Sequence, residues 1–260
     1  MDLVVSILIL FFMVSCKQVE RAHDKMGLGG LEAERRGDSN SFDRRGKERN
    51  LELYDSVVIG DQVWLAMNLD VEYFRNGDRI PQAITAEEWE QAAESRSPAW
   101  CYYNNDTLLG KRYGKLYNHY AVSDPRGLAP EGWRIPTKAD WEKLERHIGG
   151  FFGGSIKLME IEGESLANST GFGALPGGGR FREGGFEGIG KEAFFACMDT
   201  VPKMKDEAYV VWLTFEDKGN FSNIWSLPRG HGFSVRCIRE GRSTVTVIPK
   251  CSLGFVREGR

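Results

Sequence analysis

The side chains with the greatest chemical potential in this sequence are its cysteines. A cysteine can act as a nucleophile, a metal ligand, a disulfide partner or a lipid attachment site, depending on its surroundings. The sequence places no base beside Cys197 or Cys237, so it gives no support for a catalytic thiol. We therefore assign no catalytic residue. The five cysteines are Cys16, Cys101, Cys197, Cys237 and Cys251.

Metal binding and phosphate binding are the other chemistries that the residue types suggest. The four histidines have none of the spacings typical of metal ligands, so no metal site is predicted. Residues 185–191 (GFEGIGK) resemble a phosphate-binding loop, but Glu192 stands where Ser or Thr should bind magnesium. Its charge would also repel phosphate. We predict a glycine-rich turn there and no cofactor.

The N-terminal segment is typical of a bacterial export signal. Residues 3–14 are almost continuously apolar but too few to span a bilayer comfortably. The run ends in MVSC at residues 13–16, close to the lipobox of bacterial lipoproteins, although Asp2 and Met13 depart from that pattern. We predict a signal peptide over residues 1–16 and a lipid on Cys16, which would anchor the protein at the bacterial outer membrane or cell surface. A plain signal without a lipid is the alternative.

Composition divides the rest of the chain into three parts. Residues 17–53 have dense mixed charge and few large apolar side chains, which predicts a disordered tether. Residues 54–240 should form one folded domain, and residues 241–260 a tail with a strand-like piece. The formal net charge of −3 gives no indication of a nucleic-acid partner.

The folded part should be organised around a corner between a strand and a helix. Trp133 lies in a short alternating segment that Pro136 ends. Thr137 and Asp140 then form a variant capping box, and Trp141 begins an apolar helical face. We assign Trp133, Thr137 and Trp141 a structural role, because both rings should face the core.

A second helix and several strands complete the prediction. Thr85 and Glu88 form a capping box for a helix that should end near residue 95. Ring spacing in residues 113–122 slightly favours a helix over a strand, and residues 171–181 should be a glycine-lined loop. The predicted strands cover residues 57–64 as a hairpin, 99–103, and 193–198, 208–215 and 232–238 as a late antiparallel sheet.

Seven motifs come in the order typical of one protein family. They are residues 74–78 (FRNGD), 100–105 (WCYYNN), 113–118 (YGKLYN), 124–130 (DPRGLAP), 132–137 (GWRIPT), 171–178 (GFGALPGG) and 232–237 (GFSVRC). In this order they resemble the Fibrobacter succinogenes major paralogous domain, which is common in lipoproteins and secreted proteins of Bacteroidetes and Fibrobacteres. Residues 194–197 (FFAC) depart from the family, which tends to have paired Trp followed by Ser or Thr there.

The resemblance implies an α+β fold similar to C-type lectin and sulfatase-modifying domains. Such a fold has mixed short antiparallel strands, two main helices and long glycine-rich loops. If Cys16 carries a lipid, the other four cysteines allow three disulfide connectivities. The family motifs tend to carry cysteine at the positions of Cys101 and Cys237, which implies a disulfide between these two. The family's biochemical role is not settled.

Two functions remain open from the sequence. The first is a surface-anchored binding or adhesion module whose rings stack on the sugars of a polysaccharide. The candidate rings are Trp100, Tyr102, Tyr103 and Trp225. The second is an extracellular enzyme on a sulfatase-modifying-like scaffold. That function would require a cleft that holds two cysteines, or a metal with histidines.

Overall fold

The computed structural model describes residues 54–150, 154–215 and 221–239, with the side chains of residues 221 and 222 left out. Contacts divide the chain into Met1–Glu48 and Arg49–Arg260, and the described residues all belong to the second unit. The predicted signal peptide, tether and C-terminal tail therefore lie outside the described residues, as do Cys16 and Cys251.

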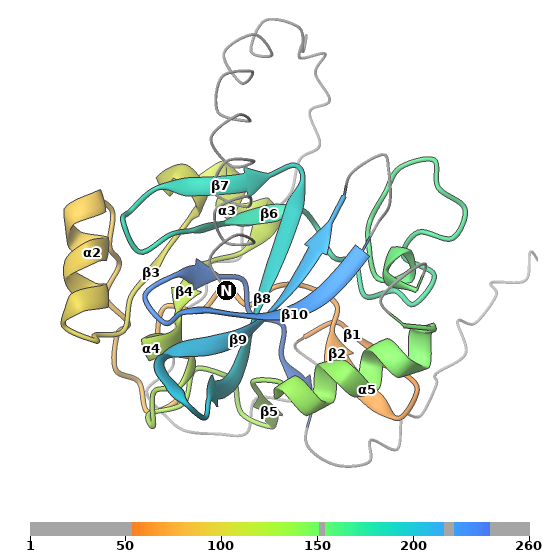
Figure 1. Ribbon diagram of the computed structural model, residues 1–260, viewed down its shortest axis with the longest axis horizontal. Coiled ribbons are helices and arrows are strands. Elements are labelled where there is room, and N and C mark those ends of the chain that lie inside the picture. Colours follow the sequence, from red (N-terminus) through yellow and green to blue (C-terminus); the bar gives the residue numbers. More distant parts are fainter. Residues whose placement is uncertain (1–53, 151–153, 216–220, 240–260) are drawn as a thin grey trace, which may run out of the picture. The chain divides into compact units, whose positions relative to one another are not determined.

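The described residues form an α+β domain with two sheets (Figure 1). The smaller sheet has four strands in the order β1 (Ser56–Ile59), β2 (Gln62–Leu65), β12 (Ile238–Arg239) and β5 (Trp133–Arg134). The larger sheet has the order β10 (Phe221–Pro228), β9 (Met204–Thr214), β8 (Glu192–Val201), β6 (Gly177–Arg180), β11 (Gly232–Phe233), β4 (Leu116–Asn118) and β3 (Trp100–Cys101), and β7 (Phe186–Ile189) pairs with β6. Strands β6 and β8 are parallel, and the other named pairs are antiparallel.

Two capped helices lie apart from each other in Figure 1, α2 (Ala86–Glu94) in gold and α5 (Lys138–Ile148) in green. Both start at the predicted capping boxes, with Thr85 paired to Glu88 and Thr137 paired to Asp140. Each box satisfies backbone N–H groups that a helix start leaves without partners. Helix α5 ends at Gly149, whose φ of 106° is readily adopted by glycine. Both helix predictions are confirmed.

The corner at Trp133 and Trp141 contributes to two clusters of the core, because Trp133 packs in the cluster around Tyr117 and Trp141 in the cluster that contains Trp64 and Phe195. The Trp141 ring is 1% exposed, and its centroid is 4.8 Å from that of Trp64 and 5.4 Å from that of Phe195. Trp133 is also buried, beneath the guanidinium of Arg239 at 4.7 Å. The two tryptophans of the corner therefore face the core, as a structural role requires.

Residues 113–122, which the sequence favoured as a helix, contain three different elements. Helix α3 (Thr107–Tyr113) ends at Gly114 with φ of 76°, β4 follows, and α4 (His119–Val122) begins at the Asn118 cap. Strand β4 is central, because it pairs with β3 on one side and β11 on the other. The ring spacing was therefore misleading, because Tyr117 is a buried residue of strand β4.

The predicted glycine loop at residues 171–181 contains strand β6 at its C-terminal end. Its glycines are required because backbone and aromatic rings pack closely against them. A Cβ on Gly178 would lie 2.4 Å from the carbonyl oxygen of Glu187 and 2.7 Å from the ring of Tyr103, and one on Gly179 would lie 2.9 Å from the ring of Phe233. Because larger side chains would clash there, the glycines mark a close approach inside the sheet.

Two arginines are buried with no carboxylate in contact among the described residues. The Arg236 guanidinium donates to the carbonyl oxygens of Leu65, Phe172 and Gly173 and to Oδ1 of Asn68. It lies over the Phe172 ring at 4.4 Å. The Arg180 guanidinium similarly donates to the carbonyls of Ala83, Ile84, Thr85 and Gly184. Backbone oxygens thus replace water around both charges.

Candidate functional site

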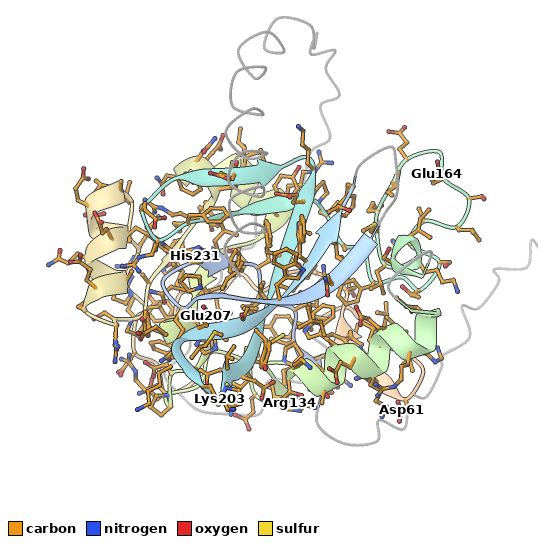
Figure 2. The ribbon with its side chains drawn as sticks, viewed as in Figure 1. Asp61, Arg134, Glu164, Lys203, Glu207 and His231 are labelled. Carbon is orange, nitrogen blue, oxygen red and sulfur yellow. The ribbon has the colours of Figure 1, made fainter. Side chains whose placement is uncertain are left out.

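The candidate site is a polar pocket of about 280 Å³ in the described part of the domain, which we call the arginine pocket. Its volume is close to the lower end of small-molecule sites, roughly 300–1,000 Å³. Figure 2 shows Glu207 and His231 on the half of the domain that carries α2. The lining residues are Ala93, Glu94, Arg96, Tyr120, Arg182, Asp206, Glu207, Pro228, Arg229 and Gly230.

One wall of the pocket is formed by α2 and the turn that follows β10, which pack tightly against each other. A Cβ on Gly230 would lie only 2.6 Å from the Cβ of Ala93, so this position must be glycine for the turn to reach α2. Two residues on, a Cβ on Gly232 would lie 2.5 Å from the buried ring of Trp89. The turn therefore has little freedom to move relative to α2.

An ion pair closes one side of the pocket. The guanidinium of Arg96, just beyond the end of α2, lies 2.7 Å from Oδ1 of Asp206. Both side chains are mostly exposed, so the pair contributes only about 0–1 kcal/mol to stability. Arg96 has a φ of 55°, which a non-glycine residue adopts rarely. The pair mainly shapes the rim of the arginine pocket.

Arg229 is held by neutral side chains. Its Nε donates to Nδ1 of His119 at 3.1 Å, and Nη2 donates to Oγ of Ser123 at 3.2 Å. The guanidinium carbon lies 4.7 Å from the centre of the Tyr120 ring. In the described residues Arg229 has no carboxylate in contact, and Nη1 makes no hydrogen bond. The pocket therefore contains a positioned cation with one donor group to spare.

The pocket also contains acceptors. Glu94 and Glu207 lie in its lining and form no ion pair in the described part of the chain. Carboxylates accept hydrogen bonds and guanidinium groups donate them, so the pocket offers both functions within one small volume. A ligand with adjacent hydroxyl groups could use both at once, because each hydroxyl donates and accepts.

The four rings predicted to stack on sugars do not gather at this pocket. Trp100 is 2% exposed and Tyr103 is 6% exposed, so neither has an open face and the stacking prediction is wrong for both. The Trp100 indole donates to the carbonyl of Ile80, and the buried ammonium of Lys115 lies over its ring at 4.5 Å. Tyr102 and Trp225 are half-buried, and for these two rings stacking stays a prediction.

The disulfide implied by the resemblance is not formed. Cys101, Cys197 and Cys237 are all free and buried. Cys101 packs in the cluster beneath α2, whereas Cys237 packs in the cluster around Tyr117, so the two side chains lie in different parts of the core. Burial raises the pKa of each thiol, to about 12 for Cys101 and Cys237. These thiols do not provide the cleft that the thiol-enzyme alternative requires.

Among the residues that the structure describes, no group of three or more His, Cys, Asp or Glu side chains could hold a metal ion. No helix in the same ranges is long and apolar enough to cross a membrane.

The sequence did not indicate the arginine pocket. Its key contacts join residues 110 positions apart, Arg96 with Asp206 and His119 with Arg229. The one local signal is the run of residues 228–232 (PRGHG), in which two basic side chains alternate with glycine just before the closing strand. Such a turn can present a charged side chain beside a close backbone contact, but the sequence does not say which elements it meets.

Comparison with known proteins adds one finding. A family model described as the Fibrobacter succinogenes major domain matches residues 57–239, which is well over half of the chain. No curated protein and no solved structure is significantly similar to this chain. The match covers both sheets, both capped helices and the arginine pocket. The chain therefore belongs to the Fibrobacter succinogenes major domain family.

Proposed function

We propose that this protein is an exported, lipid-anchored module of the bacterial cell surface that binds a neutral sugar residue of a polysaccharide in the arginine pocket. The observation that carries the proposal is the combination of Arg229 and Glu207 in one pocket of about 280 Å³. A spare guanidinium donor and an unpaired carboxylate suit a ligand that both donates and accepts hydrogen bonds. Adjacent sugar hydroxyls have this property.

The charge balance of the pocket favours a neutral ligand over a strongly acidic one. Its lining includes three arginines, Arg96, Arg182 and Arg229, and three acids, Glu94, Asp206 and Glu207. An anion would gain from Arg229 but would also approach Glu94 and Glu207, which form no ion pair with any described residue. A sugar hydroxyl carries no charge and meets either group favourably.

The C-type-lectin-like arrangement is also proposed for this domain. It is supported by the pairing of one family motif with the strand that directly follows the last motif. Strand β5 from the Trp133 corner pairs with closing strand β12 through Ile238 opposite Arg134. Strand β12 also pairs with β2 of the first hairpin, so the start and the end of the domain join in one sheet.

The test is polysaccharide binding by the full-length protein. Migration would be measured in affinity gels that contain xylan, mannan, a β-glucan or, as an acidic comparison, polygalacturonate. Arg229→Gln and Glu207→Gln should each weaken retardation by a neutral polysaccharide about tenfold or more, since a hydrogen bond to a charged group contributes about 1.5–3 kcal/mol. Arg146→Gln, an exposed arginine on α5, is the matched control and should bind like the wild type.

Two results would contradict the proposal. One is retardation of the Arg229 and Glu207 variants equal to that of the Arg146 control. The other is wild-type retardation by polygalacturonate alone, which would show that the pocket selects an anion. The folded state of each variant would be checked by its thermal unfolding.

A further inference from the structure

His119 connects the arginine pocket to the core beneath it. The residue is 4% exposed at the start of α4. Its backbone N–H donates to the carbonyl of Arg229 at 2.9 Å, and its Nδ1 accepts from Nε of the same residue at 3.1 Å. On the other side of the ring, Nε2 lies 3.3 Å from the carbonyl oxygen of Met198 on β8. His119 is therefore joined to Arg229 through both main chain and side chain.

These contacts define the protonation state of the ring. An arginine side chain can only donate hydrogen bonds, so Nδ1 of His119 must be an unprotonated acceptor. A carbonyl oxygen can only accept, so Nε2 carries the proton and donates to Met198. The arrangement is satisfied by the neutral imidazole alone, in a single tautomer.

We propose that neutral His119 is the positioning residue for Arg229, and that acid releases Arg229 from the pocket by protonating this ring. The consequence for a ligand rests on the proposed function, because only then does a sugar depend on Arg229. A protonated His119 would carry hydrogen on both nitrogens. The hydrogen bond from Arg229 would be lost, and two cations would face each other at about the same separation.

No carboxylate among the described residues contacts His119 to offset that repulsion. The groups that face the ring come from every neighbouring element: Arg229 and His231 from the turn after β10, Tyr117 from β4, Cys197 from β8 and Tyr209 from β9. The acids Asp206 and Glu207 line the pocket with Arg229. Burial, followed by the charge of Arg229, lowers the pKa of His119 to about 4.

His231 provides an internal comparison. It belongs to the same turn, lines the same small cavity as His119, and burial lowers its pKa to about 4 as well. Its ring packs against Phe181 and Phe233, and its Nδ1 has no hydrogen-bond partner among the described residues. Protonation of His231 should therefore leave the hydrogen bond between Arg229 and His119 in place.

The experiment follows the Nε–H resonances of arginine in full-length protein labelled with nitrogen-15 arginine, from neutral pH down to about pH 3. The Arg229 resonance would be assigned by its loss in Arg229→Lys. In wild type its chemical shift should move towards that of exposed arginines with a midpoint near pH 4, while the Nε–H resonances of the buried Arg180 and Arg236 stay in place. His119→Asn retains an acceptor but does not titrate, so the Arg229 resonance should not move. His231→Gln should behave as wild type.

Each outcome decides the proposal. A shift of the Arg229 resonance with the same midpoint in wild type and His119→Asn would overturn it. So would a simultaneous shift of the Arg180 and Arg236 resonances to the position of exposed arginines, because the domain would then be unfolding as a whole. The binding arm repeats the affinity gels near pH 7 and near pH 3.5 with whichever neutral polysaccharide retards the wild type. If none does, the proposed function fails, and the resonance titration still decides the role of His119.

Discussion

Replacement of Trp141 tests whether the Trp133–Trp141 corner stabilises the domain through its core packing. Trp141 begins the apolar face of α5, and its ring contacts those of Trp64, Phe172 and Phe195 at centroid distances of 4.8, 5.7 and 5.4 Å. Trp141→Ala would remove all three contacts and leave a large cavity. We expect a loss of about 3–5 kcal/mol in the free energy of unfolding. A domain has only about 5–15 kcal/mol in total, so this variant should be poorly folded.

The chemistry of the ring allows a finer comparison. The indole N–H of Trp141 has no hydrogen-bond partner among the described residues, so the ring contributes through packing. Trp141→Phe keeps an aromatic ring and removes that unpartnered donor, and should cost clearly less than Trp141→Ala. Thr137→Ala removes only the helix cap and should cost about 1 kcal/mol.

Urea denaturation followed by circular dichroism would measure all three variants. The expected order of stability is Thr137→Ala, then Trp141→Phe, then Trp141→Ala as the least stable. A Phe variant as unstable as the Ala variant would show that the indole N–H matters, which contradicts the packing argument. An Ala variant that loses less than about 1 kcal/mol would show that the corner does not stabilise the core.

Three other predictions concern acid stability, lipidation and the glycine strand. The free energy of unfolding should fall as pH drops from 6.5 to about 4, because folding keeps His119 and His231 neutral there while the unfolded chain binds protons. The decrease would be measured by urea denaturation at a series of pH values and should be smaller in His119→Asn. Incorporation of labelled palmitate should disappear in Cys16→Ala, and equal labelling of mutant and wild type would contradict the lipid anchor. Gly178→Ala should destabilise the domain by about 1–3 kcal/mol, because its φ is 62° and the new methyl would meet the Tyr103 ring, whereas Gly185→Ala has open space around it and should be near neutral in thermal unfolding.

The elements that the sequence predicted well are those with local chemical signals. Two capping boxes located α2 and α5, and the turn at Gly60 and Asp61 located the β1–β2 hairpin. Strand β10 was not predicted, because its alternation of apolar and polar residues is weak. Its strand conformation is evident from its pairing with β9 in the structure. Strand β6 was missed because its glycines are typical of a loop. The close contacts that require glycine there come from distant segments. Tertiary contacts thus overrode local preference at both strands.

The candidate site was beyond prediction for a related reason. The candidate stacking rings were selected by residue type. The core of this domain is itself rich in aromatic residues, and Trp100 and Tyr103 belong to that core. The pocket residues have no motif of their own. Arg229 acquires its role from His119 and Ser123, and nothing in the sequence near Arg229 specifies those partners. Residue type indicated which side chains had chemistry, and only the fold indicated which of them lie at a surface.

The buried guanidinium groups of Arg180 and Arg236 have a consequence for how this family can vary. Both hold loops through main-chain oxygens, and a main-chain oxygen is present at every residue whatever its side chain. These hydrogen bonds therefore fix the backbone path of the loops and place no demand on the exposed side chains there, such as that of Ile84. The arginines themselves cannot be exchanged for lysine, because a single ammonium cannot replace the several N–H donors of a planar guanidinium. A paralogous family built this way can diversify its exposed loops while it retains one scaffold.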